Sequence, residues 1–261
     1  MNGALFVAKT GLSAQDTALR VVSNNLANLS TDGFKRDRAV FEDLVYQIKR
    51  QPGAQSAEGT ELPSGLQLGT GVRAAGTVKQ FTQGTLNVTD QNLDIAVEGR
   101  GFFQIALPNG EIAYTRSGRF QLNSTGQVVT SQGYLVDPQI SIPADATSIS
   151  IGNDGTVSVT QASSTVASQV GQLTLAGFTN PSGLQAMGGN MFQETVSSGS
   201  PTTGNPDTAE FGRTIQGALE NSNVNSVEEL VNMISTQRAF EMNSKVISTV
   251  DEMLSFVTQQ L

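Results

Sequence analysis

The chain has 261 residues, which is enough for a sizeable core and one or two domains. It contains no cysteine and no histidine, which excludes disulfides, thiolate or histidine catalysis, and metal sites built from these residues. A net charge of −8 argues against a nucleic-acid partner and against an anionic membrane surface.

The first predicted element is a long amphipathic helix over residues 4–30. Its apolar side chains recur every seven residues at Leu5, Leu12, Leu19 and Leu26, and Val22 and Leu29 follow two of these by three residues. A seven-residue repeat keeps one stripe of a helix facing a partner helix, so these residues predict a helix-packing seam. Gly33 suits the left-handed turn that ends such a helix.

The next predicted element is an extended arm over residues 46–71. An apolar patch at residues 40–48 leads into it and is predicted to be extended or partly helical. Residues 51–71 contain two prolines and five glycines without a helical period, so they predict a long loop or arm. Prolines restrict the backbone and leucines offer apolar anchors. The residues predicted to make the arm rigid are Pro52, Leu62, Pro63 and Leu66.

From residue 72 to about 214 the pattern predicts short β-strands. Apolar and polar residues alternate, for example at 93–97, 149–151 and 157–159, as in half-buried strands. Turn sequences separate the runs at Asn109-Gly110, Ser124-Thr125-Gly126 and Asn153-Asp154-Gly155. Many short strands at close spacing favour an antiparallel sandwich or barrel over alternating strands and helices.

The last predicted element is a second amphipathic helix from Ser226 to the end of the chain. Ser226 and Glu229 match a capping box, which satisfies free amides at a helix start. Its candidate packing residues, several of them seven apart, are Leu230, Met233, Phe240, Ile247, Val250, Leu254 and Val257. Val246 and Met253 broaden the stripe, which suits a packed bundle better than a single helical hairpin.

The two predicted helical ends carry opposite charges. Residues 1–50 hold 7 basic and 5 acidic side chains, a net charge of +2. Residues 221–261 hold 2 basic and 5 acidic side chains, a net charge of −3. Exposed ion pairs contribute little each, so this difference favours pairing only mildly. Long helices placed at both ends are typical of a protein whose ends assemble.

An enzyme remains one alternative class. Asp90, Asp94 and Glu98 lie in a strand-like stretch and could supply paired carboxylates for glycoside hydrolysis, although acidic residues at a hairpin edge usually face water. A surface adhesin with a β head is another alternative, but one continuous stalk would be expected there. We expect no catalytic residue, cofactor or metal ion. We also expect neither a cleaved signal peptide nor a membrane-inserted segment.

Several segments resemble the signatures of the flagellar rod and hook axial proteins. At the N-terminal end these are SNNLAN at 23–28 and TDGFK at 31–35. The C-terminal signature comprises SNVN at 222–225, EELV at 228–231, QRAFE at 237–241 and NSK at 243–245. The central motifs are VEGRGFF at 97–103 and YTRSGRF at 114–120. The resemblance therefore runs from end to end of the chain.

The resemblance implies an α+β fold with three parts. Residues 1–45 and 215–261 would form a discontinuous helical assembly core, a coiled-coil bundle. Residues 46–71 would form an extended arm specific to the rod, and residues 72–214 an inserted all-β domain of short antiparallel strands. Total length and the arm favour a subunit of the distal rod, because the hook protein would be longer in the middle. A proximal-rod subunit of similar length is the alternative.

The resemblance also implies a structural function. Subunits would be exported unfolded by the flagellar type III apparatus and would polymerise helically into a rigid, hollow drive shaft across the periplasm. This shaft would transmit torque from the motor to the hook and form the export channel. The implied partners are other copies of the chain, proximal-rod proteins, the hook protein, and the ring proteins of the peptidoglycan layer and the outer membrane.

Overall fold

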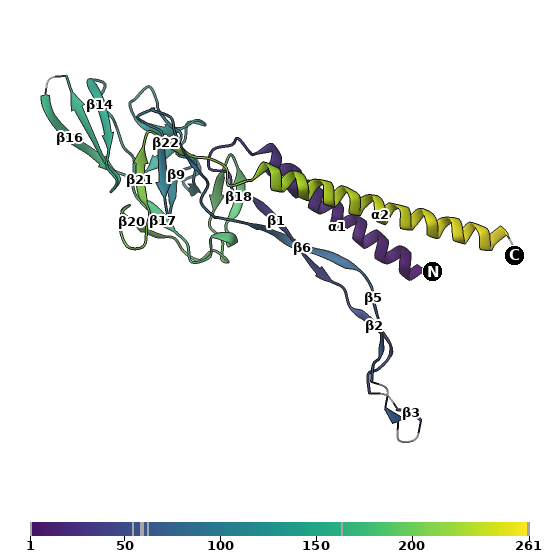
Figure 1. Cartoon of the computed structure of the whole chain (residues 1–261). Coiled ribbons are helices and arrows are strands. Elements are labelled where there is room, and N and C mark those ends of the chain that lie inside the picture. The colour runs from purple at the N-terminus through teal and green to yellow at the C-terminus, as the bar shows by residue number, and fades with distance from the viewer. Residues whose placement is uncertain (1, 54, 58–59, 62, 163, 260–261) are drawn as a thin grey trace. The chain divides into compact units, whose positions relative to one another are not determined.

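The computed structural model describes residues 2–53, 55–57, 60–61, 63–162 and 164–259 (Figure 1). Helices stand at both ends and short antiparallel strands between them, so the predicted α+β fold is confirmed. The chain divides into two compact units. The first comprises Met1–Ala27, Asp37–Val78 and Asn225–Leu261, and the second comprises Asn28–Arg36 and Lys79–Val224. The division by role into an assembly core, an arm and a β domain stays a prediction.

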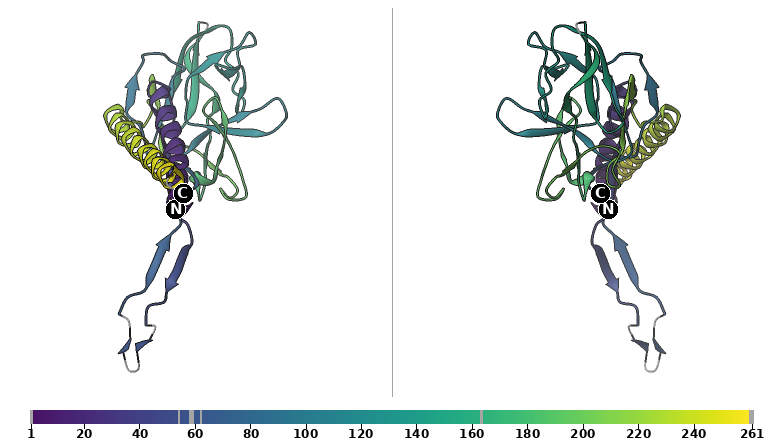
Figure 2. Two further views of the ribbon diagram at one scale, coloured as in Figure 1. Left: turned by 90° about the vertical axis from the view of Figure 1, so that its right-hand side faces the viewer. Right: turned by 90° about the vertical axis from the view of Figure 1, so that its left-hand side faces the viewer.

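The first unit contains two long helices, α1 (Asn2–Ala27) and α2 (Ser226–Gln259), which pack against each other (Figure 2). The prediction that the first helix continues to Ser30 was wrong. The carbonyl of Asn28 accepts a hydrogen bond from the amide of Thr31 at 3.3 Å, and the chain turns there instead.

The capping box predicted for the second helix was also wrong. The side-chain oxygen of Asn225 accepts hydrogen bonds from the amides of Val227, at 3.0 Å, and Glu228, at 3.4 Å. Asn225 is therefore the N-cap, since it satisfies amides that have no partner within the helix. Glu229 does not serve the helix start, because its side chain is buried against α1.

The remainder of the first unit is a two-stranded β ribbon. Its strands are β1 (Asp37–Asp43), β2 (Tyr46–Arg50), β3 (Gln55–Ala57), β4 (Thr60–Glu61), β5 (Leu66–Gly69) and β6 (Val72–Lys79). Strand β1 pairs with β6, β2 with β5 and β3 with β4 (Figures 1 and 2). The patch at residues 40–48 is therefore extended rather than helical, and β2 and β5 form the two antiparallel sides of the arm.

The second unit consists of short strands and one 3-10 turn. Its elements are β7 (Leu86–Val88), β8 (Ile95–Glu98), β9 (Phe102–Ala106), β10 (Ile112–Thr115), β11 (Phe120–Leu122), β12 (Val128–Thr130), β13 (Leu135–Asp137), β14 (Ala146–Ile151), β15 (Thr156–Gln161), β16 (Ser164–Gln172), β17 (Leu175–Gly177), η1 (Pro181–Gly183), β18 (Gln185–Gly188), β19 (Met191–Gln193), β20 (Thr202–Gly204), β21 (Arg213–Gln216) and β22 (Ala218–Glu220). The largest sheet has the order β11-β12-β13-β9-β10-β19-β18, with β17 joining β9 to β20. Strands β14, β15 and β16 form a second sheet, while β21 pairs with β8 and β22 with β7.

The hairpin turns of the second unit lie where the sequence predicts them. Asn109-Gly110 joins β9 to β10, and Asn153-Asp154-Gly155 joins β14 to β15. In the latter turn Asp154 accepts a hydrogen bond from the amide of Thr156 at 3.1 Å, and Gly155 adopts a φ of +80°. An Asp or Asn side chain favours such a turn because it accepts a hydrogen bond from the backbone two residues on, and glycine favours it because it adopts a positive φ at little cost.

The core of the second unit lies on both sides of strand β9. Successive strand residues face opposite ways, so Phe103 and Ile105 enter the main core while Phe102 enters a smaller aromatic cluster. In the cluster the rings of Phe102 and Phe192 meet edge to face with centroids 6.2 Å apart. Strand β9 therefore separates two apolar layers.

Gly33 offers a test of the turn that follows α1. It adopts a φ of +71°, and a Cβ there would lie 2.5 Å from the backbone nitrogen of Ser117. We predict that Gly33→Ala lowers the free energy of unfolding by more than the roughly 1–2 kcal/mol that a left-handed residue costs. Gly110→Ala, at φ +85° with no atom within 4 Å, is the matched control and should lose only that amount. Urea denaturation measures both, and equal losses would contradict the prediction.

Candidate functional site

The seam between the two helices is lined mainly by small and polar side chains. Along α2 the buried residues Glu229, Thr236 and Val250 and the half-buried Asn243 follow one another every seven positions. The amide of Asn25 donates a hydrogen bond to Oε2 of Glu229 at 3.3 Å. At the other end of the pair, a Cβ on Gly11 would lie 3.2 Å from Nδ2 of Asn243. The most deeply buried side chains of the helix pair are therefore small or polar, and the leucines of α1 are only half-buried.

The residues predicted to line the assembly interface differ in how far they are buried. Val22 and Val250 are buried, while Leu230 and Phe240 stay 47 % and 37 % exposed. Half-buried positions are Leu5, Leu12, Leu19, Leu26, Leu29, Met233, Ile247 and Leu254, of which Leu29 belongs to the second unit. The side chain of Val257 lies outside the described residues. Their participation in an assembly interface stays a prediction.

Large apolar side chains on both helices face solvent instead. On α1 these are Phe6 and Val7, and on α2 they are Val227, Val231, Ile234, Met242, Val246, Met253 and Phe256. Contiguous exposed apolar surface marks an interaction site. Val227, Val231 and Ile234 lie four and then three residues apart, which is the spacing of one helix face, and the predicted packing residues do not include them.

The arm exposes apolar side chains on both faces of its ribbon. Tyr46 and Ile48 lie on one face, and Leu68 lies on the other, opposite Gln47. Leu66 is 51 % exposed, and Pro52 and Pro63 are also exposed; Leu62 lies outside the described residues. A two-stranded ribbon is marginally stable by itself. The apolar residues on its two faces therefore indicate contacts with other surfaces.

The second unit contains a buried ion cluster. It joins the segment that follows α1 in the sequence to the segment that precedes α2. Nζ of Lys35 lies 2.6 Å from Oε1 of Glu220, and Nε of Arg116 lies 2.8 Å from Oε2 of the same carboxylate. All three side chains are 5 % exposed or less. Lys35 follows the TDGF turn, and Glu220 ends β22. One carboxylate thus joins the entering and leaving segments of the chain.

Backbone groups complete this cluster. Lys35 donates to the carbonyl of Thr82 at 2.8 Å, and the amide of Gly84 donates to Glu220 at 2.9 Å. Arg116 also donates to the carbonyls of Gly101 and Val97. Burial lowers the pKa of Lys35, while the charge and hydrogen bond of Glu220 oppose that shift. The sequence motifs contain Lys35 and Arg116, but nothing in the pattern pointed to Glu220.

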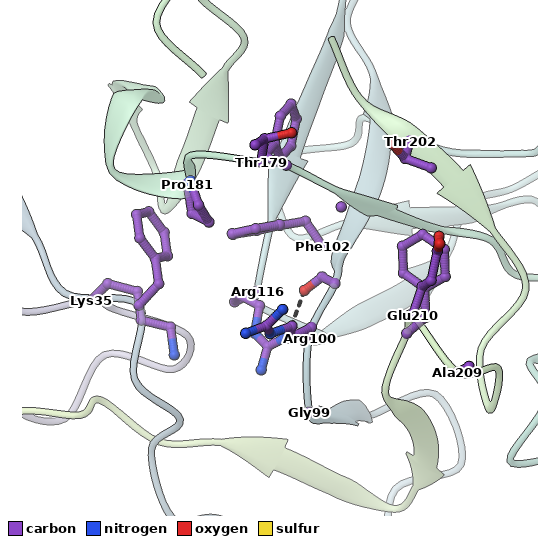
Figure 3. Close-up of a pocket in the computed structure, with 15 residues that line it drawn as sticks. Lys35, Gly99, Arg100, Phe102, Arg116, Thr179, Pro181, Thr202, Ala209 and Glu210 are labelled. Carbon is purple, nitrogen blue, oxygen red and sulfur yellow. Dashed lines mark hydrogen bonds between the residues drawn. The ribbon is translucent and has the colours of Figure 1, made fainter. Parts of the chain in front are cut away.

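A groove of about 700 Å³ opens beside this cluster (Figure 3). Its lining is mixed, with the aromatic side chains of Phe81, Phe102, Phe178 and Phe211 beside polar and charged ones such as Arg100 and Glu210. Among its described lining residues Glu210 is the single carboxylate, and Lys35 and Arg116 are already engaged with Glu220. Paired-carboxylate hydrolysis needs two acids flanking one bond, and this lining does not supply them.

The acidic residues considered for catalysis have structural partners. Asp94 accepts a hydrogen bond from the hydroxyl of Thr89 at 2.6 Å. Glu98 forms an ion pair with Arg213 at 2.5 Å. The amide of Asp90 donates to the carbonyl of Gly217 at 3.3 Å, at a φ of +58°. These residues close turns and strand pairs of the β unit.

Comparison with known families matches three parts of the chain. Residues 5–35 match the family described as flagella basal body rod protein. Residues 96–159 match the D1 domain of the flagellar hook protein FlgE/F/G family, and residues 215–260 match the flagellar basal body rod FlgEFG protein C-terminal family. The first and last matches cover most of the two helices, and the second covers part of the main β core.

Similar proteins extend the match to nearly the whole chain. The flagellar basal-body rod protein FlgG of Buchnera aphidicola subsp. Schizaphis graminum is 54 % identical over 256 residues, which is 98 % of each chain. FlgG of Caulobacter vibrioides is 47 % identical over 98 % of each chain, and FlgF of the same organism is 32 % identical over 100 % of this chain and 98 % of its own. The chain belongs to the family of flagellar basal-body rod proteins. Within the described residues, no helix is long and apolar enough to span a membrane.

Glu220 provides a test of the ion cluster. We predict that Glu220→Gln lowers the free energy of unfolding by about 3–5 kcal/mol, because two buried cations then lack their counterion. The matched control is Glu98→Gln in the pair with Arg213, whose side chains are 42 % and 52 % exposed; it should cost at most about 1 kcal/mol. Urea denaturation followed by circular dichroism measures both variants. Similar losses in the two would show that the buried cluster is no stronger than a surface pair.

Tyr114 provides a test of the aromatic cluster through pH. Burial, followed by the charge of Glu194, raises the pKa of Tyr114 from 10.0 to about 12. The unfolded chain then releases this proton before the folded chain does, so the free energy of unfolding should fall as pH rises from about 10 to about 12. Tyr114→Phe should reduce that slope and remove the last step of tyrosinate absorbance. An unchanged slope in the variant would contradict the assignment.

Proposed function

We propose that this chain is the structural subunit of the flagellar distal rod. Copies polymerise helically into a rigid, hollow drive shaft that transmits torque from motor to hook and encloses the export channel. The observation that carries this proposal is the packing of the helix pair, which buries small and polar residues and leaves residues such as Phe6, Val231 and Met242 exposed. Repeated contacts between unlike surfaces of one subunit generate open helical filaments when the rotation between neighbours does not close a ring.

The comparison within one organism favours the distal rod over the proximal-rod alternative. This chain is 47 % identical to the FlgG of Caulobacter vibrioides and 32 % identical to the FlgF of the same organism, over nearly full length in both cases. Length alone does not separate the two relatives, because both align from end to end. The difference in identity therefore supports the distal position.

The remaining assignments rest on membership of the family. In this proposal residues 1–45 and 215–261 form the assembly core, residues 46–71 the arm, and residues 72–214 the outer β domain. The shaft crosses the periplasm, and its subunits are exported without cleavage of a signal peptide. Partners are other copies, the proximal-rod proteins, the hook protein, and the ring proteins of the peptidoglycan layer and outer membrane. The subunit catalyses no reaction, so purified protein should release no fragments from peptidoglycan.

The arm is proposed to make the shaft rigid. Apolar residues on both faces of the ribbon, such as Ile48 and Leu68, suit it to lie between neighbouring subunits. Contacts of this kind resist the sliding of one subunit past another that lets a tube bend. The ribbon can be shortened without opening its base, because the hydroxyl of Thr70 donates to the carbonyl of Val45 at 2.7 Å.

Deletion of residues 46–66 tests the function and the arm together. Purified unmodified chain should form straight rods in electron micrographs, whereas the deletion variant should form curved or bendable filaments, because lateral contacts are lost. Ile48→Ser with Leu68→Ser should reproduce the bending at full arm length. Gln47→Ser with Gln67→Ser, on the same strands, is the control and should give straight rods.

The outcomes separate the two proposals. Absence of any polymer from the unmodified chain would contradict self-assembly. Straight, stiff rods from the deletion variant would assign the rigidity to the terminal helices instead of the arm.

A further inference from the structure

The groove beside the ion cluster has no role in the assembly proposed above. The described residues that line it all belong to the second unit (Figure 3). The helix pair and the arm, which carry the proposed assembly, belong to the first unit. A volume of about 700 Å³ is typical of protein sites that bind a ligand. The groove is therefore a candidate for a contact of a different kind.

Two aromatic rings give the groove an apolar wall. Phe81 and Phe178 line it and are half-buried. Both meet the buried Phe102 edge to face, with ring centroids 5.4 Å and 5.9 Å from that of Phe102. These contacts hold the two rings in place while part of their surface stays accessible. A wall that is already ordered can accept an apolar side chain at little cost in conformational entropy.

Arg100 gives the groove a cation without a partner. It is exposed, and its side chain forms no ion pair or hydrogen bond within the part of the chain that the structure describes. Its backbone is closely held, because its carbonyl accepts a hydrogen bond from the amide of Gly212 at 2.8 Å. The flanking Gly99 and Gly101 adopt φ of +110° and +131°, and a Cβ on Gly101 would lie 3.0 Å from Cδ1 of Leu175. The guanidinium therefore projects from a backbone of defined conformation.

The charge at the groove is opposite to that of the unit around it. The second unit carries 12 acidic and 7 basic side chains, a net charge of −5. At the groove the cations are Lys35, Arg100 and Arg116. The carboxylates there are Glu210 in the lining and Glu220, which pairs with two of the cations, so the local net charge is +1. Such a site favours an anionic ligand, and a guanidinium can bind a carboxylate through two parallel hydrogen bonds.

We propose that this groove binds a segment of a partner protein in which an apolar side chain adjoins a carboxylate. The carboxylate pairs with Arg100, and the apolar side chain packs against Phe81 and Phe178. A small anion alone would leave the rings uncovered, and a purely apolar segment would leave the guanidinium without a counterion. The inference goes beyond the proposed self-assembly, since it concerns neither the helix pair nor the arm.

Three matched peptides test the chemistry of the ligand. The first is N-acetylated and C-amidated glycine-phenylalanine-glutamate-glycine, whose single charge is the carboxylate, and the other two carry glutamine or lysine in place of the glutamate. Saturation-transfer NMR titrations measure their affinities for the intact chain. The glutamate peptide should bind roughly fivefold more tightly than the glutamine peptide, because an exposed ion pair contributes about that factor. The lysine peptide should bind most weakly. Equal affinities, or no binding, would overturn the proposal.

Substitution of Arg100 tests where the peptide binds. Arg100→Gln should bind the glutamate and glutamine peptides equally, because the cation that distinguishes them is gone. Arg119→Gln is the matched control, since Arg119 is an arginine of the same unit that is 56 % exposed and does not line the groove. It should keep the preference of the unmodified chain. A preference retained by Arg100→Gln, or lost in Arg119→Gln, would contradict the proposed site.

Polymerisation distinguishes a partner protein from a second copy of the chain. Arg100→Glu should form rods at the same critical concentration as the unmodified chain. A raised critical concentration with unchanged circular dichroism would assign the groove to a contact between copies and overturn the proposal. If the unmodified chain forms no rods, the proposed function fails, while the peptide affinities still decide this inference.

Discussion

One α1 helix cannot cover the apolar surface that α2 presents, and the rest of the subunit follows from this mismatch. Gly11 of α1 lies against Asn243 and Asn25 contacts Glu229, while residues such as Met242 and Phe256 stay exposed. Buried area drives association, so the subunit keeps its main hydrophobic gain for contact with other copies. A buried pair such as Asn25 and Glu229 adds direction, because a displaced register would leave both groups without their partner.

The β unit solves a different problem, which is to hold the chain where it leaves and re-enters the helices. Glu220 accepts from two cations and a backbone amide, so removal of any one partner leaves charge or hydrogen-bonding capacity unsatisfied in a dry interior. Gly33 lies in the adjacent turn and donates its amide to the carbonyl of the same Glu220 at 2.7 Å. The ion cluster, the turn that contains Gly33 and the end of β22 therefore all depend on Glu220.

Much of this architecture was predictable from the sequence, because local chemistry determines it. Asn-Gly and Asp-Gly pairs set the hairpins, and apolar repeats set the helices. The seam was not predictable in the same way. Hydrophobicity pointed to Met233 and Phe240, but Glu229 is buried because Asn25 lies opposite it, and pairing across two hundred residues leaves no local trace. The arm was predicted to be a loop or extended, but the pairing of its strands was not, since Pro52 and Gly65 resemble loop residues until a partner strand is known. No pattern in the sequence indicated that Glu220 would be buried and paired with two cations.

The contacts of Glu220 have a consequence for how the chain folds. Lys35 lies 185 positions from Glu220 in the sequence, and Arg116 lies 104 positions from it. Closing loops of this length costs conformational entropy before the contact can repay it, so such contacts form slowly. The ion cluster would therefore complete the β unit late in folding, after the local hairpins have formed.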